Sequence, residues 1–278
     1  MLPELLGLPE VPFEGFEDSP LVLAMCQVRF SNVLGLADSA LIGPFQREIQ
    51  DRYPVSQEIA GLEMQVSLEH GEPEIREKGA VRSFRFADST DNWAVVLAQD
   101  FVSVETRAYE RFSDFLARLR QVLIALNRHV RPTIRTRIGL RYVNEIRPGH
   151  SNWASIVREE LLGPLTVSEL TVNTTALTAV QQLLLRYPNN LGINIRHGTF
   201  LDGTTVQPLP GQEPERGLFY LLDFDAFHEA QTAMSLPVDT DEICQYVESF
   251  NRAIYRLFRW ALKDDYLSSL GAYQYDTD

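Results

Sequence analysis

Two aspartates at alternate positions of one apolar segment are the residues best suited to chemistry. Within residues 218–227, LFYLLDFDAF, Asp223 and Asp225 interrupt an otherwise hydrophobic run. On a strand that rises about 3.3 Å per residue, they would lie on the same face, about 7 Å apart. Two carboxylates in this arrangement can bind Mg²⁺ or Ca²⁺. One hypothesis is therefore a metal-dependent hydrolase or nuclease that uses both aspartates.

A group of arginines is the second candidate for chemistry. Residues 133–146, TIRTRIGLRYVNEI, read as a strand, and alternation places Arg135, Arg137 and Arg141 on one face of it. The planar guanidinium group binds carboxylates and phosphates through paired hydrogen bonds. Gly139 removes one side chain from this face and could admit a ligand or a neighbouring backbone. The face is either a binding surface or a side of the sheet whose charges are neutralised by acids.

The arginines and aspartates are expected to meet on one sheet face. If residues 133–146 pair antiparallel with 217–227, opposite charges lie across the strand pair and contribute about 0.2–1 kcal/mol each. Alternation assigns further polar residues to this face: Glu169, Thr171, Asn173, Gln182, Arg186, Asn194 and Arg196. The predicted binding residues are Arg135, Arg137, Arg141, Arg186 and Arg196. The alternative is a solvated face on which the arginines only form ion pairs.

No recognised catalytic motif accompanies these residues. The sequence contains no G-x-x-x-x-G-K-[ST] phosphate loop, no G-x-G-x-x-G, no H-E-x-x-H and no G-x-S-x-G. The five histidines are scattered singly, so neighbouring histidines do not form a metal site. Cys26 and Cys244 have no C-x-x-C partner and are interpreted as buried thiols. We therefore predict no catalytic residues, no bound metal and no cofactor.

Composition favours a soluble globular protein. Hydrophobic residues make up 45% of the 278-residue chain, as is common in such proteins. The apolar runs are far shorter than the roughly 18 residues that span a bilayer, so no membrane segment is predicted. The first 20 residues carry five acids and no basic region, which does not fit a secretory signal. These features predict a cytoplasmic protein that does not associate with membranes.

The pattern of strands and helices repeats along the chain. Residues 21–30 read as a strand, followed by a helix at 43–54, four strands, and a long helix at 110–130. The second set has a strand at 133–146, a helix at 152–163, strands at 166–177, 179–187, 191–198 and 218–227, and a long helix at 239–267. Both halves therefore read strand, helix, four strands, helix.

This order predicts an α+β fold built by tandem duplication, with antiparallel sheets packed on long helices. It resembles the TATA-box-binding-protein-like and helix-grip folds. The predicted parts are an acidic N-terminal arm at 1–19, a first α+β repeat at 20–132, and a second repeat with a short acidic tail at 133–278. On the last helix, an apolar stripe is predicted to pack on the sheet: Phe250, Ile254, Leu257, Phe258 and Ala261.

Two short blocks carry a family resemblance. One is the R-x-G-L-R-Y-x-N-x-I strand from Arg137 to Ile146, and the other is the T-x-x-Y-x-x-F-x-x-F segment that starts at Thr106. They resemble a sporadically distributed family of uncharacterised bacterial proteins of about this length. The resemblance extends over most of the chain from about residue 20. It implies a bacterial, patchily inherited protein carried with mobile or defence loci, and it implies no catalytic residues.

Three functional hypotheses follow from these observations. The first is a non-catalytic binding or interaction protein, an accessory or regulatory subunit of a mobile or defence locus that engages another protein. The second is a binder of single-stranded nucleic acid or a small nucleotide-like anion on the arginine face. The third is the metal-dependent hydrolase that uses Asp223 and Asp225. The net charge of −13 argues against a broad surface for duplex DNA.

Overall fold

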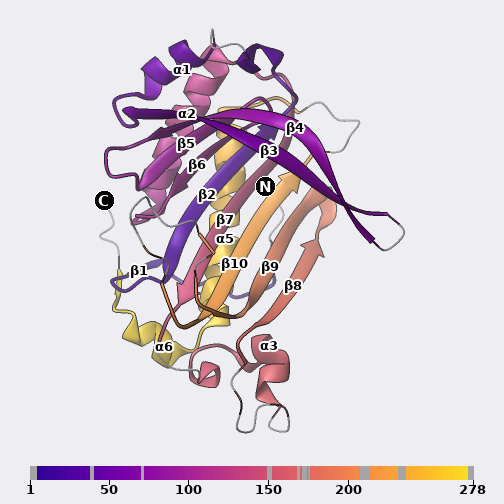
Figure 1. Ribbon diagram of the computed structural model, residues 1–278. Helices are drawn as coiled ribbons and strands as arrows, with labels where there is room; N and C mark the ends of the chain where they lie inside the picture. The colour runs from indigo at the N-terminus through magenta and orange to yellow at the C-terminus, as the bar shows by residue number, and fades with distance from the viewer. Residues whose placement is uncertain are drawn as a thin grey trace.

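One antiparallel sheet forms the centre of the protein. The computed structural model describes residues 5–37, 41–69, 72–148, 152–167, 170, 174, 176–203, 205–206, 213, 215–230 and 236–274. Nine strands make up this sheet, in the order β3-β4-β5-β6-β2-β7-β10-β9-β8, and each neighbouring pair is antiparallel. The predicted α+β class with an antiparallel sheet is confirmed (Figure 1).

The two halves of the chain supply the two halves of the sheet. The first half contributes β2 (Leu21–Phe30), β3 (Val55–Glu69), β4 (Glu72–Ala87), β5 (Trp93–Ala98) and β6 (Phe101–Thr106). The second half contributes β7 (Arg135–Ile146), β8 (Ala179–Arg186), β9 (Leu191–Leu201) and β10 (Leu218–Glu229). The first strands of the two halves, β2 and β7, pair with each other and join the halves in the middle of the sheet.

Helices cover one face of the sheet, which we call the helix-side face. Figure 1 shows the long helices α2 (Phe112–His129) and α5 (Thr240–Ala261) behind the central strands. α1 (Ile42–Ile49) packs beside α2. The shorter helical segments are η1 (Leu34–Ala37), η2 (Trp153–Ser155), α3 (Glu159–Leu162), η3 (Gly163–Thr166), η4 (Pro188–Asn190) and α6 (Asp264–Ser269). A separate two-stranded sheet pairs β1 (Glu14–Phe16) with β11 (Ala272–Gln274).

The core lies between the helices and the helix-side face. The predicted stripe on α5, from Phe250 to Ala261, is buried, because its residues recur at spacings of three and four and so share one side of the helix. Cys26 is fully buried on β2, as alternation predicts. In β10, Leu222 and Phe224 face this core, whereas Asp223 lies on the opposite face. We call this opposite side of the sheet the outer face.

Three predicted elements differ from the structure. The described residues of 166–177 are not in a strand, because η3 ends at Thr166 and Leu170 is helical. The helix predicted at 152–163 is divided into η2 and α3. The long final helix ends at Ala261, where the backbone becomes extended at Leu262 and pairs with Val157 before α6 begins. The second half therefore contributes four described strands to the sheet rather than five.

No helix among the described residues is both long and apolar enough to cross a membrane.

Candidate ligand-binding cleft and arginine face

The predicted meeting of arginines and aspartates is found on the outer face. β7 and β10 are antiparallel neighbours, with Arg141 opposite Asp225 and Arg137 opposite Glu229. Both arginines reach diagonally to a carboxylate. Arg141 donates two hydrogen bonds of 2.7 Å to Asp223, and Arg137 donates one of 2.6 Å to Asp225. The pairs are partly buried, so solvent screens them less than fully exposed pairs.

Gly139 admits a side chain of its own strand. A Cβ atom at position 139 would lie 3.0 Å from Cζ of Arg137 and closer still to Nη1, so the guanidinium group of Arg137 occupies the space that the glycine leaves. This group also lies over the Phe227 ring, 4.9 Å from its centroid, and Arg186 approaches the same ring to 4.8 Å. The gap in the arginine face is therefore filled by the protein itself.

Arg135 does not belong to the outer face, which corrects the prediction from alternation. The pairing of β2 with β7 shifts register between Arg29 and Phe30, so Phe30 lies opposite Arg135 rather than Thr136. This irregularity turns Arg135 to the helix-side face, where its side chain is only 1% exposed. It contacts Glu242 of α5 at 3.3 Å and lies 5.4 Å from the Tyr246 ring centroid. Its Nε and Nη1 atoms have no hydrogen-bond partner in the described structure.

The other two predicted binding residues lie on the outer strands of the same face. Arg186 of β8 forms a 2.7 Å ion pair with Glu229. Arg196 of β9 lies over the Phe200 ring and has no carboxylate within 4 Å among the described residues. Gln182 and Asn194 are hydrogen-bonded to each other beside them. Glu169, Thr171 and Asn173, which were also predicted for this face, lie outside the described residues.

Both aspartates of β10 are hydrogen-bonded to arginines of β7. Burial raises the pKa of the Asp225 carboxyl, and the charge and hydrogen bond of Arg137 oppose this shift. The hydrogen bond to Asp223 raises the pKa of Arg141 above its ordinary value. The described residues contain no group of three or more His, Cys, Asp or Glu side chains that could hold a metal ion. The geometry of this pair is that of an ion-paired sheet face.

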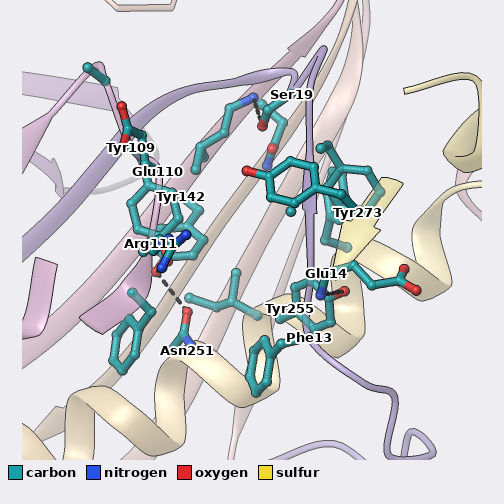
Figure 2. Close-up of a pocket in the computed structure, with 18 of the residues that line it drawn as sticks. Phe13, Glu14, Ser19, Tyr109, Glu110, Arg111, Tyr142, Asn251, Tyr255 and Tyr273 are labelled. Atoms are coloured by element: carbon teal, nitrogen blue, oxygen red, sulfur yellow. Dashed lines mark hydrogen bonds between the residues drawn. The ribbon is translucent and has the colours of Figure 1, made fainter. Parts of the chain in front are cut away.

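A cleft of about 940 Å³ opens at one end of the helix-side face. Its floor is formed by β7 and α5, one wall by residues 107–113, and the other wall by the N-terminal arm together with β11. Figure 2 shows aromatic and polar side chains from all of these segments directed at the same space. Its aromatic lining residues are Phe13, Phe16, Tyr109, Phe112, Tyr142, Tyr255, Phe258 and Tyr273.

The N-terminal arm forms its wall by docking on α5. Phe13 packs on the Tyr255 ring at 4.6 Å, and the Glu14 backbone N–H donates to the Tyr255 hydroxyl at 2.9 Å. The Glu14 carboxylate pairs with Arg259, and β1 adds the pairing with β11. The arm is also held by Phe16, which packs edge-on against Phe258.

A chain of hydrogen bonds crosses the cleft floor. The Tyr142 hydroxyl donates to Oδ1 of Asn251 at 2.8 Å, and it lies 3.2 Å from the Tyr109 hydroxyl, which can donate to it (Figure 2). The Tyr142 hydroxyl has one proton, and Oδ1 of Asn251 can only accept, so Tyr142 donates to Asn251 and accepts a hydrogen bond from Tyr109. The chain connects residue 109, strand β7 and helix α5, which are far apart in sequence.

Two amide groups on this floor keep unused hydrogen-bonding atoms. Asn251 is 5% exposed and Asn144 is 3% exposed, and both line the cleft. Nδ2 of Asn144 donates to the Leu222 carbonyl at 3.2 Å. Among the described residues, Nδ2 of Asn251 and Oδ1 of Asn144 have no hydrogen-bond partner. The floor therefore offers one donor and one acceptor beside apolar and aromatic side chains.

The cleft lining combines hydroxyl, amide and charged groups, among them Ser19 and Ser113. The described lining residues include no His, Cys, Lys or Asp. Its charged residues are Arg107 and Arg111 against Glu14, Glu17 and Glu110, and Glu14 is paired with Arg259. The arrangement offers aromatic surfaces, hydroxyl and amide groups for hydrogen bonds, and a nearly balanced charge.

The cleft was not predicted from the sequence, although both resemblance blocks contribute to it. Tyr109 and Phe112 belong to the segment that starts at Thr106, and Tyr142 and Asn144 belong to the strand from Arg137 to Ile146. The available signal was that Tyr142 and Asn144 place polar atoms at alternate, helix-facing positions of a buried strand. No family model matches the chain, and a search of curated proteins found no match.

Proposed function

We propose that the protein is a non-catalytic binding protein whose ligand occupies the cleft between the N-terminal arm, residues 107–113 and α5. The observation that carries this proposal is the pair of buried amides on the floor, Asn144 and Asn251, each with an unused polar atom next to the cavity. Both atoms are open to the cleft, and a ligand that covered them would have to pair with them, because polar groups buried in proteins are nearly always hydrogen-bonded. A ligand that pairs with these atoms explains why they are retained.

The side chain of Asn251 is not required by the packing of α5. It lies among the apolar residues of the helix, between Phe250 and Ile254, where leucine would fit the pattern. Neither Nδ2 of Asn251 nor Oδ1 of Asn144 is among the buried side-chain atoms that lack a partner, so both atoms are open to the cleft, where water can pair with them. A ligand that displaced this water and left either atom unpaired would lose about 1–3 kcal/mol of binding free energy, so the floor selects a ligand with matching polar groups.

We also propose that the chain is a tandem duplication related to the TATA-box-binding-protein-like fold, with units at 20–132 and 133–278. Two features support this: β2 and β7 pair at the centre of the sheet, and the long helices α2 and α5 end the two halves. The family resemblance supports a bacterial, cytoplasmic accessory or regulatory subunit of a mobile or defence locus. If variants of the cleft keep the fold and lose both the ligand and this accessory or regulatory activity, the activity depends on the cleft.

Binding of another protein or of a small anion to the arginine face is the second candidate function. It is favoured by Arg196, which has no carboxylate within 4 Å among the described residues, and by the exposure of Arg186. Replacing both by alanine should then remove the partner or weaken a salt-dependent interaction. The hydrolase hypothesis lacks comparable support, because Asp223 and Asp225 are both engaged by arginines.

The proposal is tested with a low-molecular-mass extract of bacterial cells. The full-length protein is incubated with the extract, washed, and analysed by native mass spectrometry. We expect the wild type to retain a compound that the Tyr142→Phe/Asn251→Leu double variant does not retain. Asn32→Leu, on an exposed residue, is the matched control. Retention by the double variant, together with loss in the Arg186→Ala/Arg196→Ala variant, would support the arginine face instead.

A further inference from the structure

We infer that the ligand of the cleft is a nucleobase, held as the free base or the nucleoside and not as a phosphorylated nucleotide. This inference rests on the proposed function, because it specifies the ligand of the same cleft. Three properties of the cleft support it: a donor and an acceptor on the floor, aromatic side chains around the cavity, and the balance of charge at the walls.

The floor offers the two kinds of polar atom that pair with the edge of a nucleobase. Nδ2 of Asn251 is a donor and Oδ1 of Asn144 is an acceptor, and no described residue pairs with either. Every nucleobase carries donors and acceptors side by side in the plane of its ring, and asparagine is a common partner of such an edge. A purely apolar ligand would leave both amide atoms buried and unpaired, which disfavours it.

The space above the floor is suited to a flat ring. Tyr142 rises from β7 and its hydroxyl is held by Asn251, while Phe258 and Ile254 come from the facing side of α5. Phe13 and Tyr255, whose rings pack against each other at a tilt of 34°, extend the aromatic surface along the arm. Proteins bind unpaired bases by stacking them on such side chains, because every base has a π-face. A cavity of about 940 Å³ has ample room for a nucleoside.

The charges at the walls argue against a phosphate. The lining contains Arg107 and Arg111, but also Glu17, Glu110 and the arginine-paired Glu14. A phosphate bound there would meet carboxylates as well as guanidinium groups, and like charges disfavour binding. The sites that hold phosphates usually concentrate arginines, lysines or backbone N–H groups. An uncharged base or nucleoside avoids the repulsion and keeps the floor and ring contacts.

Calorimetric titration of the full-length protein tests this inference. The probes are adenosine, guanosine, cytidine and uridine, and the corresponding 5′-monophosphates. We expect at least one nucleoside to bind, its monophosphate to bind no more tightly, and Asn251→Leu to weaken nucleoside binding about tenfold or more, the effect of leaving a ligand group unpaired. Asn32→Leu should bind like the wild type.

Three results would overturn the inference. A monophosphate that binds about tenfold more tightly than its nucleoside would show that an anion is recognised. Nucleoside binding that is unchanged in Asn251→Leu would place the base elsewhere. If no nucleoside binds while the wild type still retains a compound from the cell extract, the ligand class is wrong but the proposed function stands. If neither nucleosides nor extract compounds bind, both proposals fail.

Discussion

Replacing Gly139 by alanine is expected to destabilise the protein through a single neighbouring side chain, Arg137. Position 139 has no positive φ angle, so the backbone of β7 itself accepts alanine. The new Cβ would lie 3.0 Å from Cζ of Arg137, and the guanidinium group must move away. That movement breaks its 2.6 Å hydrogen bond to Asp225 and its stacking on Phe227.

The size of the effect can be worked out from these contacts. A charge-assisted hydrogen bond contributes about 1.5–3 kcal/mol, and this one belongs near the lower limit because both side chains are about one-fifth exposed. Loss of the contact with Phe227 adds about 0.5–1 kcal/mol. Against this, replacing glycine by alanine stabilises by about 0.4–1 kcal/mol through the unfolded chain. The net loss of unfolding free energy is therefore about 1–2 kcal/mol.

A double-mutant cycle measured by urea unfolding checks this reasoning. In an Arg137→Ala background, no guanidinium group occupies the space above residue 139, so Gly139→Ala should be neutral or stabilising. The coupling between the two changes should be about 2–2.5 kcal/mol, because the effect of alanine on the unfolded chain is the same in both backgrounds and cancels. If Gly139→Ala has no effect in the wild type, or the same effect in both backgrounds, then Arg137 is not held in this space and the account of the arginine face is incorrect.

Three further experiments, one labelling reaction and two substitutions, test the buried ionisable side chains. Burial raises the pKa of the Cys26 thiol, so thiol reagents should label it only after unfolding, and fast labelling of the native protein would contradict the strand register. Arg135→Met should lower the free energy of unfolding by less than about 1 kcal/mol or raise it, because the change removes a buried charge with unpaired atoms and leaves Glu242 partly solvated. A loss of about 3 kcal/mol or more, measured by urea unfolding, would refute this reasoning. Burial lowers the pKa of His228 below its value in the unfolded chain, so the unfolded state binds a proton at a higher pH than the folded state does. The stability that depends on the neutral ring is therefore complete above about pH 6.5 and is lost as the pH falls below that value. His228→Gln should reduce the fall in unfolding free energy between pH 7 and pH 5, and an unchanged pH dependence would contradict the burial of this ring.

The arginine face was largely predictable because strand faces follow a simple alternation. Arg137 and Arg141 could be paired with the aspartates of β10 from two segments and one assumed antiparallel contact. Arg135 could not, because a one-residue irregularity in the pairing with β2 reverses every face beyond it, and neither sequence marks its position. The prediction of a strand at 166–177, which the described residues of this range do not form, was wrong for a similar reason, since alternation alone does not show whether a partner strand is present.

The cleft could not have been predicted in the same way, because its parts meet only in the folded chain. Tyr109, Tyr142 and Asn251 form one hydrogen-bonded chain, yet they come from three separate segments. Taken alone, Tyr142 fits a core position and Asn251 is one polar residue in an apolar stripe. What identifies a candidate site is that Nδ2 of Asn251 and Oδ1 of Asn144 have no partner among the described residues and lie beside a cavity, which is a property of packing and not of sequence spacing.

The unfolding free energy of the Tyr142→Phe/Asn251→Leu variant, without ligand, tests the central claim most directly. Both partners of the hydrogen bond between Tyr142 and Asn251 are replaced by apolar groups of similar shape, and the Tyr109 hydroxyl, which lines the cleft, can pair with water in place of Tyr142, so the expected change is within about 1 kcal/mol of zero. Such a result would mean that these polar groups serve a ligand and not the fold. Destabilisation by more than about 2 kcal/mol would contradict the account, because it would show that they are held in place for stability.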